Sequence, residues 1–249
     1  MTEFNITVQG GSSVRLPTAG KYCDRDIVIT AKGGAESELL IQGKLTEWDI
    51  PDGVESIRAY AFYNNTGLTR VSVPDSVTSI GGHAFYGASK VVSLTLGNGL
   101  TGLPQDGFGL MRGLVNLKLP DKLISIGGYA FRAANLSKIY FPETLETVGD
   151  HAFWECRNLI FVHFGANIKT LGPSSFSDCI KLKTVVIHAP STVCTLNNIN
   201  AFKSTPIASG TGFIYVHDNL VEQYKTETNW STYASQIRAI EDYPDITGG

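Results

Sequence analysis

One short pattern recurs along this chain at an almost constant interval. A small residue precedes a phenylalanine in each of six copies, and successive phenylalanines lie 23 residues apart, except for one step of 22. The six pairs are Ala61-Phe62, Ala84-Phe85, Gly107-Phe108, Ala130-Phe131, Ala152-Phe153 and Ser175-Phe176. Self-similarity at a fixed period of this length is typical of a solenoid, in which each repeat forms one turn and packs on its neighbours. We therefore expect a stack of similar turns between Ile50 and Ile187.

A second pattern in every repeat predicts a short parallel strand. Three apolar residues stand in an L-x-x-L-x-L spacing, first as Leu68, Val71 and Val73. The same spacing returns as Val91-Leu94-Leu96, Leu114-Leu117-Leu119, Leu136-Ile139-Phe141, Leu159-Val162-Phe164 and Leu182-Val185-Ile187. Strands of this pattern line up in one parallel sheet that runs along the stack. A proline follows the strand in several copies, where its missing amide hydrogen ends the pairing.

Taken together, the repeat positions resemble the BspA-like leucine-rich repeats of bacteria, whose signature is close to I-P-x-x-V-x-x-I-G-x-x-A-F-x-x-C-x-x-L-x-x-V. The resemblance covers residues 50–187 and a degenerate seventh unit that contains Ala201-Phe202. It implies a right-handed leucine-rich-repeat solenoid of about seven turns. The asparagine ladder that follows the strand in ordinary leucine-rich repeats is missing, and the corresponding residues are Ser76, Gly99, Lys122, Thr144, Asn167 and Pro190. The convex side is therefore expected to be mostly non-helical.

Three regions follow from the extent of the repeats. Residues 1–37 do not repeat, and their short alternating runs predict a small β head that ends in a linker over residues 32–37. Residues 38–187 are the leucine-rich repeats. Residues 188–249 are expected to form a degenerate last repeat and a C-terminal cap, because an open stack end would expose a strand edge. In this cap a strand is predicted over residues 213–216 and a helix from Asp218 to about residue 229.

The head carries a second resemblance. The segment SSVRLPTAGKYCDRDIVITA is similar to a short module at the start of phage tail and prophage-encoded proteins of gut Firmicutes. This resemblance implies that the head could dock the chain to a larger assembly. Its Asp24-Arg25-Asp26 triplet is expected to be a solvated turn with an internal ion pair. The N-terminus lacks the pattern of a secretory signal, so we expect a phage virion or the cytoplasm if the chain is complete, and the cell surface if it is trimmed.

Composition and motifs exclude several function classes. The net charge is −3 and no basic block is present, so a nucleic-acid partner is not expected. No apolar run is long enough for membrane insertion. Nucleophile elbows, phosphate-binding loops, metalloprotease helices and calcium loops are all missing from the sequence. We therefore expect no enzyme, no catalytic residues and no cofactor.

The histidines and cysteines do not form a recognisable metal pattern. His83 and His151 share a repeat position, but three turns of ~4.8 Å separate them by ~14 Å, too far to bind one metal ion. The four cysteines include no C-x-x-C pair. Cys156 and Cys179 occupy the same position in adjacent turns, close to the range of a disulfide. Burial of both as small hydrophobic residues is the favoured interpretation.

The solvent face of the predicted sheet offers a candidate binding surface. Strand side chains alternate, so the residues that flank the middle apolar position point away from the core. On the later turns these residues include four rings and two lysines, namely Tyr140, Phe161, His163, Tyr215, Lys118 and Lys138. Exposed aromatic residues on a rigid concave sheet are typical of a binding surface. Two alternative roles stay open for the rings: they could form stabilising cross-strand pairs, or the C-terminal cap could cover them.

A further aromatic row is expected to pack under the turns, and it consists of Tyr63, Tyr86 and Trp154. The function that follows from these observations is non-enzymatic recognition. One hypothesis is a receptor-binding or accessory protein of a phage or prophage tail, whose partner is a protein or glycan on a bacterial surface. A second is a BspA-like cell-surface adhesin that binds a host or bacterial surface, and a third is an intracellular protein-binding scaffold. The first two rest on resemblance and the third on the fold alone.

Overall fold

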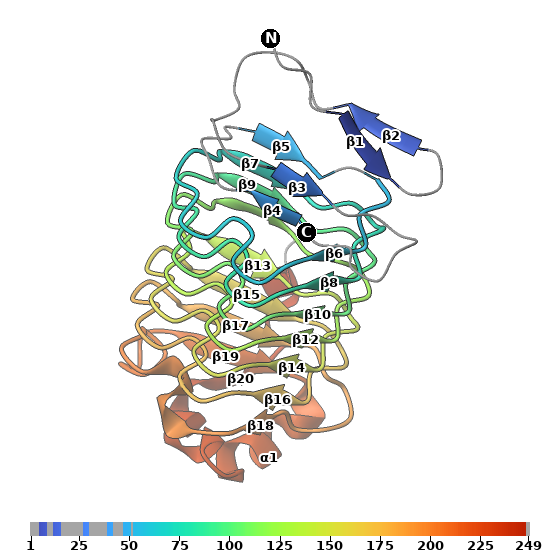
Figure 1. Cartoon of the computed structure of the whole chain (residues 1–249). Coiled ribbons are helices and arrows are strands. Elements are labelled where there is room, and N and C mark those ends of the chain that lie inside the picture. Colours follow the sequence, from blue (N-terminus) through green and yellow to red (C-terminus); the bar gives the residue numbers. More distant parts are fainter. Residues whose placement is uncertain are drawn as a thin grey trace.

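The fold is described from a computed structural model, shown in Figure 1. It describes residues 47–50 and 52–247, together with four strands nearer the N-terminus, β1 (Asn5–Val8), β2 (Ser12–Arg15), β3 (Ile27–Ile29) and β4 (Leu39–Ile41). β1 pairs antiparallel with β2, and β3 pairs antiparallel with β4. Cys23, the triplet at residues 24–26 and the linker at residues 32–37 lie outside the described residues.

The six L-x-x-L-x-L segments and three further segments form nine parallel strands on one side of the solenoid. Four of them make one sheet: β5 (Glu47–Asp49), β7 (Arg70–Ser72), β9 (Ser93–Thr95) and β11 (Asn116–Lys118). Five more make a second sheet: β13 (Lys138–Tyr140), β15 (Phe161–Phe164), β17 (Thr184–Ile187), β19 (Phe213–Val216) and β20 (Ile237–Ala239). We call the solvent side of these nine strands the sheet face. Its strands pair in register, so equivalent repeat positions lie side by side.

The opposite side of the stack consists of two-residue strands and turns. Its strands are β6 (Ser56–Ile57), β8 (Ser79–Ile80), β10 (Gly102–Leu103), β12 (Ser125–Ile126), β14 (Thr147–Val148), β16 (Thr170–Leu171) and β18 (Thr195–Leu196). From β10 to β18 they form one continuous parallel ladder. No helix lies in the repeats from residue 52 to residue 187, which confirms the mostly non-helical solenoid predicted from the missing asparagines.

A column of phenylalanine rings fills the space between the two sides. Each ring stacks on the ring of the next turn, with centroids 4.6–5.9 Å apart from Phe62 through Phe202. All seven side chains are fully buried. Phe202 lies in the degenerate seventh unit, so the column continues past the point at which the spacing of the sequence changes. Burial of this column explains why every copy keeps a phenylalanine after a small residue.

The turns around each phenylalanine form a third ladder. The residues two before and two after the ring adopt left-handed φ angles, which non-glycine residues seldom do. The first set is Tyr60, His83, Asp106, Tyr129, His151 and Ser174, and the second is Asn64, Gly87, Leu110, Ala133, Glu155, Asp178 and Ser204. All but Ser174 and Ser204 donate their amides to carbonyls of the next turn, as Asn64 does to Tyr86 at 2.7 Å. These turn-to-turn hydrogen bonds hold the strained conformation in place.

The two sheets of the sheet face are separated by a break between β11 and β13, which do not pair. The break coincides with the one short step of the repeat. The middle strand residue follows the phenylalanine by eight positions at Ile139 but by nine at Leu117 and Val162. Leu117 is consequently only partly buried, whereas its equivalents are buried. The ring column and the ladder from β10 to β18 cross this point without interruption.

The C-terminal part contains short helices: η1 (Ile199–Phe202), η2 (Asp218–Leu220), α1 (Val221–Thr226), η3 (Trp230–Gln236) and η4 (Pro244–Thr247). The prediction of one helix from Asp218 to about residue 229 is therefore wrong in length and start. α1 has six residues, and a 3-10 turn precedes it. It ends because the chain becomes extended at Glu227, and Asn229 then takes a positive φ of 66°.

Side chains from this region close the open edge of β18. The Tyr224 hydroxyl accepts a hydrogen bond from the backbone amide of Cys194 at 2.9 Å, and the Trp230 indole donates to the carbonyl of the same residue at 2.5 Å. Asn229 Nδ2 donates to the carbonyl of Leu196 at 2.7 Å. Tyr224 and Trp230 are fully buried. These polar groups take the place of a further strand and prevent edge-to-edge association.

Candidate recognition surface

The structure places the predicted surface residues in two columns on the sheet face. Tyr140, His163, Val186 and Tyr215 are register partners on β13, β15, β17 and β19. Phe161 pairs with Lys138 in the neighbouring column. The columns therefore lie as the alternation of the strands predicts.

Tyr140 is the most open ring of the surface. Its side chain is 49% exposed, and its ring lies 5.3 Å from that of Phe161 and 6.0 Å from that of His163. Lys138 is exposed on the same strand, and Lys118 is exposed on β11 across the break. Phe161 and His163 are half-buried. Tyr140 is thus supported by neighbouring rings and still accessible to a partner.

The expectation that Tyr215 is exposed is wrong. Only 6% of Tyr215 is accessible, because residues 240–246, which we call the C-terminal strap, cross the sheet face above it. Tyr243 packs edge-on against its ring at 5.1 Å. Ile240 and Ile246 join it in a small apolar cluster with Val186, Phe161 and Phe213. Coverage by the C-terminal cap was one of the alternatives that the sequence left open, and it holds for this residue.

Two histidines that sequence analysis did not single out lie beside His163. His188 and His217 follow β17 and β19, two residues after the surface positions Val186 and Tyr215, so they point to the same side. The ring centroids are 6.1 Å apart between His163 and His188 and 4.8 Å apart between His188 and His217. We call these three residues the histidine row. Strand alternation extended by two residues would have found it.

The ends of the histidine row differ in electrostatic environment. Burial, followed by the neighbouring His188, lowers the pKa of His163, and Glu143 opposes this shift. At the other end His217 Nδ1 lies 2.8 Å from the carboxylate of Glu241, which also accepts a hydrogen bond from the amide of Asp218. Burial alone would raise the pKa of Glu241, but these hydrogen bonds hold it below its usual value. The His217–Glu241 contact therefore ties the C-terminal strap to the sheet face.

A second group of rings lies on the turns that flank the phenylalanine column. Tyr63 stacks on Tyr86 at 5.5 Å, and Tyr60 stacks on His83 at 5.0 Å. Tyr63 is 45% exposed, so the prediction that this row packs under the turns is wrong for its first member. Trp154 fits that prediction better. It is half-buried, and its indole donates a hydrogen bond to Asp178 at 2.8 Å.

The remaining candidate groups are possible metal ligands and the two cysteines of adjacent turns. Among the described residues there is no cluster of three or more residues that could hold a metal ion. Cys156 and Cys179 are free thiols, and each donates to a backbone carbonyl of the preceding turn at 3.2 Å. Burial raises the pKa of Cys179 well above its usual value, which keeps this thiol unreactive. Within the same part of the chain, no helix has the length and apolar character needed to cross a membrane.

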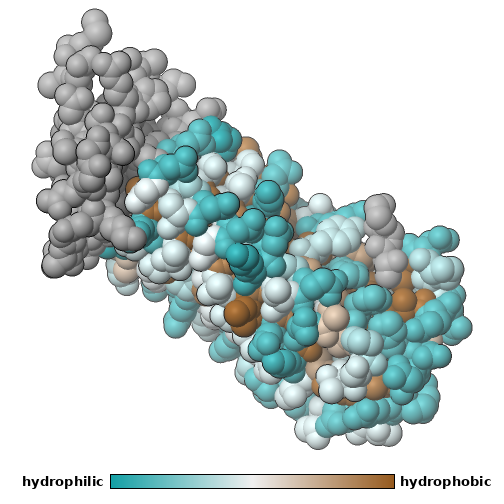
Figure 2. Space-filling model, turned by 90° about the vertical axis from the view of Figure 1, so that its right-hand side faces the viewer, coloured by the Kyte–Doolittle hydropathy of each residue, from teal (hydrophilic) through white to brown (hydrophobic). Residues whose placement is uncertain are grey.

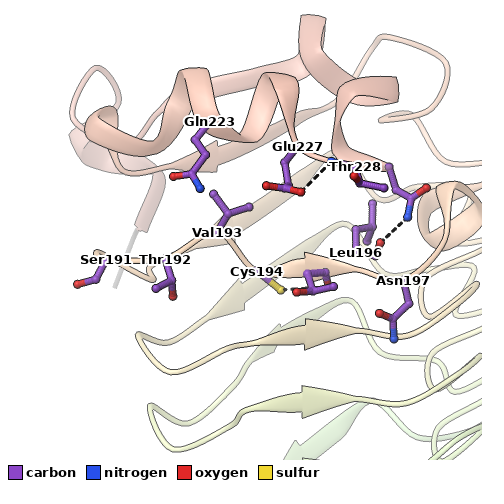
Figure 3. A pocket seen from close by; sticks show the side chains of 11 residues that line it. Ser191, Thr192, Val193, Cys194, Leu196, Asn197, Gln223, Glu227 and Thr228 are labelled. Carbon is purple, nitrogen blue, oxygen red and sulfur yellow. Dashed lines mark hydrogen bonds between the residues drawn. The ribbon is translucent and has the colours of Figure 1, made fainter.

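A groove of about 450 Å³ lies between β18 and α1 (Figure 3). Figure 3 shows Gln223 of α1 and Glu227, just after this helix, above Leu196 of β18 and Cys194, which precedes this strand. Its lining contains no histidine, lysine or arginine. Glu227 is therefore the one charged side chain of its lining. The side of the molecule in Figure 2 carries scattered hydrophobic residues among hydrophilic ones, without one large hydrophobic patch.

Parallel one-turn repeats with a shared ring column define a leucine-rich-repeat solenoid. A family profile described as the BspA type leucine rich repeat region matches six copies over residues 37–160 and 103–213. The chain belongs to this family. The match starts at residue 37, and nothing in the comparisons supports the expected phage-like head.

Two solved structures illustrate the similarity. A leucine-rich repeat protein from Bacteroides ovatus is 23% identical over 80% of this chain, with a TM-score of 0.57, and this chain spans 56% of its length. A leucine rich repeat protein from T. pallidum is 30% identical over 59% of this chain and 72% of its own, also with a TM-score of 0.57. A search among curated proteins found no significant match.

Proposed function

We propose that this chain is a non-enzymatic recognition module that binds a partner protein on a bacterial or host surface through its sheet face. The binding residues are Tyr140, Phe161, His163, Lys118 and Lys138. The observation that carries the proposal is the exposure of Tyr140 on a rigid parallel sheet. An aromatic ring of low conformational entropy, held by neighbouring rings, is the residue type that dominates the energy of protein interfaces.

The family supports recognition on the cell surface better than recognition from a phage tail. BspA-type repeats are usually non-enzymatic, and the match indicates no catalytic family. The sheet face is also pre-organised: the strand hydrogen bonds and the buried ring column fix the positions of Tyr140 and Phe161 before binding. Less ordering entropy is then lost on association. A surface glycan is the alternative ligand for the same residues.

The test is the binding of the labelled protein to a panel of bacterial cells, host matrix proteins and purified surface glycans. A Tyr140→Ala/Phe161→Ala double variant should lose selective binding while it still unfolds in a cooperative thermal transition. Tyr63→Ala is the matched control, because it removes a tyrosine of similar exposure from the turns instead of the sheet face. Equal binding by the double variant would refute the sheet face as the site. An absence of any binding by the folded protein would refute the function.

A further inference from the structure

The C-terminal strap shows which kind of peptide the sheet face accepts. Its sequence from Glu241 to Ile246 is EDYPDI, which combines three carboxylates with one aromatic and one aliphatic side chain. Tyr243 packs against Tyr215, and Ile246 joins the apolar cluster below it. The Glu241 carboxylate contacts His217, which lies at the strap's end of the histidine row. An acidic segment with apolar anchors is therefore already bound on one part of this surface.

Side chains of the same kinds lie on the sheet face beyond the part that the strap covers. His188 and His163 extend the histidine row toward Tyr140, each within 6.1 Å of the next ring. Lys138 and Lys118 lie exposed at this end and carry positive charge. The strap covers Tyr215 but leaves Tyr140 49% exposed. The sheet face thus carries two sets of groups of the same kinds. Each set has aromatic rings that can contact an apolar side chain and nitrogen-bearing side chains that can bind a carboxylate. The strap covers the first set.

We propose that the open part of the sheet face, formed by Tyr140, His163, His188 and Lys138, binds an acidic segment of a partner protein, and binds it more tightly as the pH falls. This inference rests on the proposed function and adds the chemistry of the partner. The segment would resemble the strap, with a carboxylate directed at the histidine row and an aromatic or aliphatic side chain against Tyr140. Charge complementarity to the histidines and lysines favours this occupant over a neutral or basic one.

The pH dependence follows from the groups that face the histidine row. His163 faces His188 on the side of β17, and Tyr140, Lys138 and Glu143 on the side of β13. His188 and His217 face each other, and Glu241 from the strap faces His217. One carboxylate is thus already committed to His217. Protonation of His163 adds positive charge beside Lys138, which an incoming acidic group can balance.

The probe is a fluorescent peptide with the sequence EDYPDI, added to the full chain at pH 7.5 and pH 5.5 under constant ionic strength. Peptide carboxylates stay ionised over this range. The expected result is binding about three- to fivefold tighter at pH 5.5, the gain that one or two exposed charge pairs supply. The neutral peptide QNYPNI is expected to bind more weakly and without a pH effect.

Three variants locate the site. His163→Gln should weaken binding at pH 5.5 and so abolish the pH effect, and Tyr140→Ala should weaken binding at both values. Tyr63→Ala, on the turns, should leave both affinities unchanged. Equal affinity for both peptides, a flat pH profile, or binding that is indifferent to Tyr140→Ala would each overturn the proposal. If cells or proteins of the panel still bind through Tyr140 in that case, the proposed function stands and only the acidic segment is refuted.

Discussion

Two pairs of stacked rings in this protein have the same geometry and different burial. Phe85 and Phe108 lie 5.5 Å apart with an interplanar angle of 8°, and so do Tyr63 and Tyr86. Phe108 is 0% exposed, whereas Tyr63 is 45% exposed. Each also contacts one further ring, at 5.2 Å in Phe108 and 5.5 Å in Tyr63. Replacing Phe108 and Tyr63 separately by alanine distinguishes the contribution of burial from that of ring stacking.

Phe108→Ala should lower the free energy of unfolding by about 3–5 kcal/mol, because it removes a fully buried ring and leaves a cavity in the column. Ring contacts account for part of this loss, about 0.5–1.5 kcal/mol for each pair. Tyr63→Ala loses similar contacts but leaves no cavity, so a cost of about 1 kcal/mol or less is expected, as for other surface substitutions. Phe108→Leu loses the ring contacts but leaves a smaller cavity, so it should cost clearly less than Phe108→Ala.

Urea unfolding followed by circular dichroism measures all three variants against the parent chain. We expect a clear order, with Phe108→Ala far more destabilising than the other two. Similar losses for Phe108→Ala and Tyr63→Ala would refute the dominant role of burial, because stacking itself would then stabilise the solenoid. A loss below about 1 kcal/mol for Phe108→Ala would also refute it, since the ring column would not be tightly packed.

Three other predictions concern the cap, the histidine row and the turns. Tyr224→Phe should cost about 1–3 kcal/mol in urea unfolding, because the buried amide of Cys194 loses its acceptor; an unchanged midpoint would show that the edge of β18 needs no side-chain cap. His163 has a lowered pKa in the folded chain, so the unfolded chain binds its proton first and stability should fall as the pH drops below 6.5. His163→Gln should make that decline in stability shallower. An equally steep decline in the variant would show that His163 is not its cause. Gly81→Ala would place a Cβ 2.2 Å from the backbone nitrogen of Ala59 in the preceding turn, so a loss of about 1–3 kcal/mol is expected from thermal or urea unfolding.

The regular part of this fold could be predicted from the sequence because each repeat restates the same information. The period gave the stack, and strand alternation gave the correct columns for Tyr140 and Phe161. Prediction failed where a residue's surroundings come from distant sequence. Tyr215 is buried by the C-terminal strap, and no local pattern shows where that segment runs. His188 and His217 were passed over because they lie just beyond their strands.

The helix expected after Asp218 illustrates a second limit. Apolar spacing favoured a helix of about three turns, but its backbone must also bring Tyr224 and Trp230 to the edge of β18. Those hydrogen bonds require the chain to turn at Glu227 and Asn229, so tertiary contacts override local propensity. The break between β11 and β13 shows the same limit. The one short step was visible in the sequence, but only the strand pairing shows that it divides the sheet.

That break divides the sheet face into two separately hydrogen-bonded halves. On the opposite side of the stack the ladder from β10 to β18 is continuous, whereas on the sheet face no strand hydrogen bond links β11 to β13. The two halves are therefore held together by that ladder, by the hydrogen bonds of the turns and by the ring column, in which Phe108 and Phe131 lie 5.2 Å apart. Lys118 lies on one half and Tyr140 on the other, so a partner that contacts both residues spans the break.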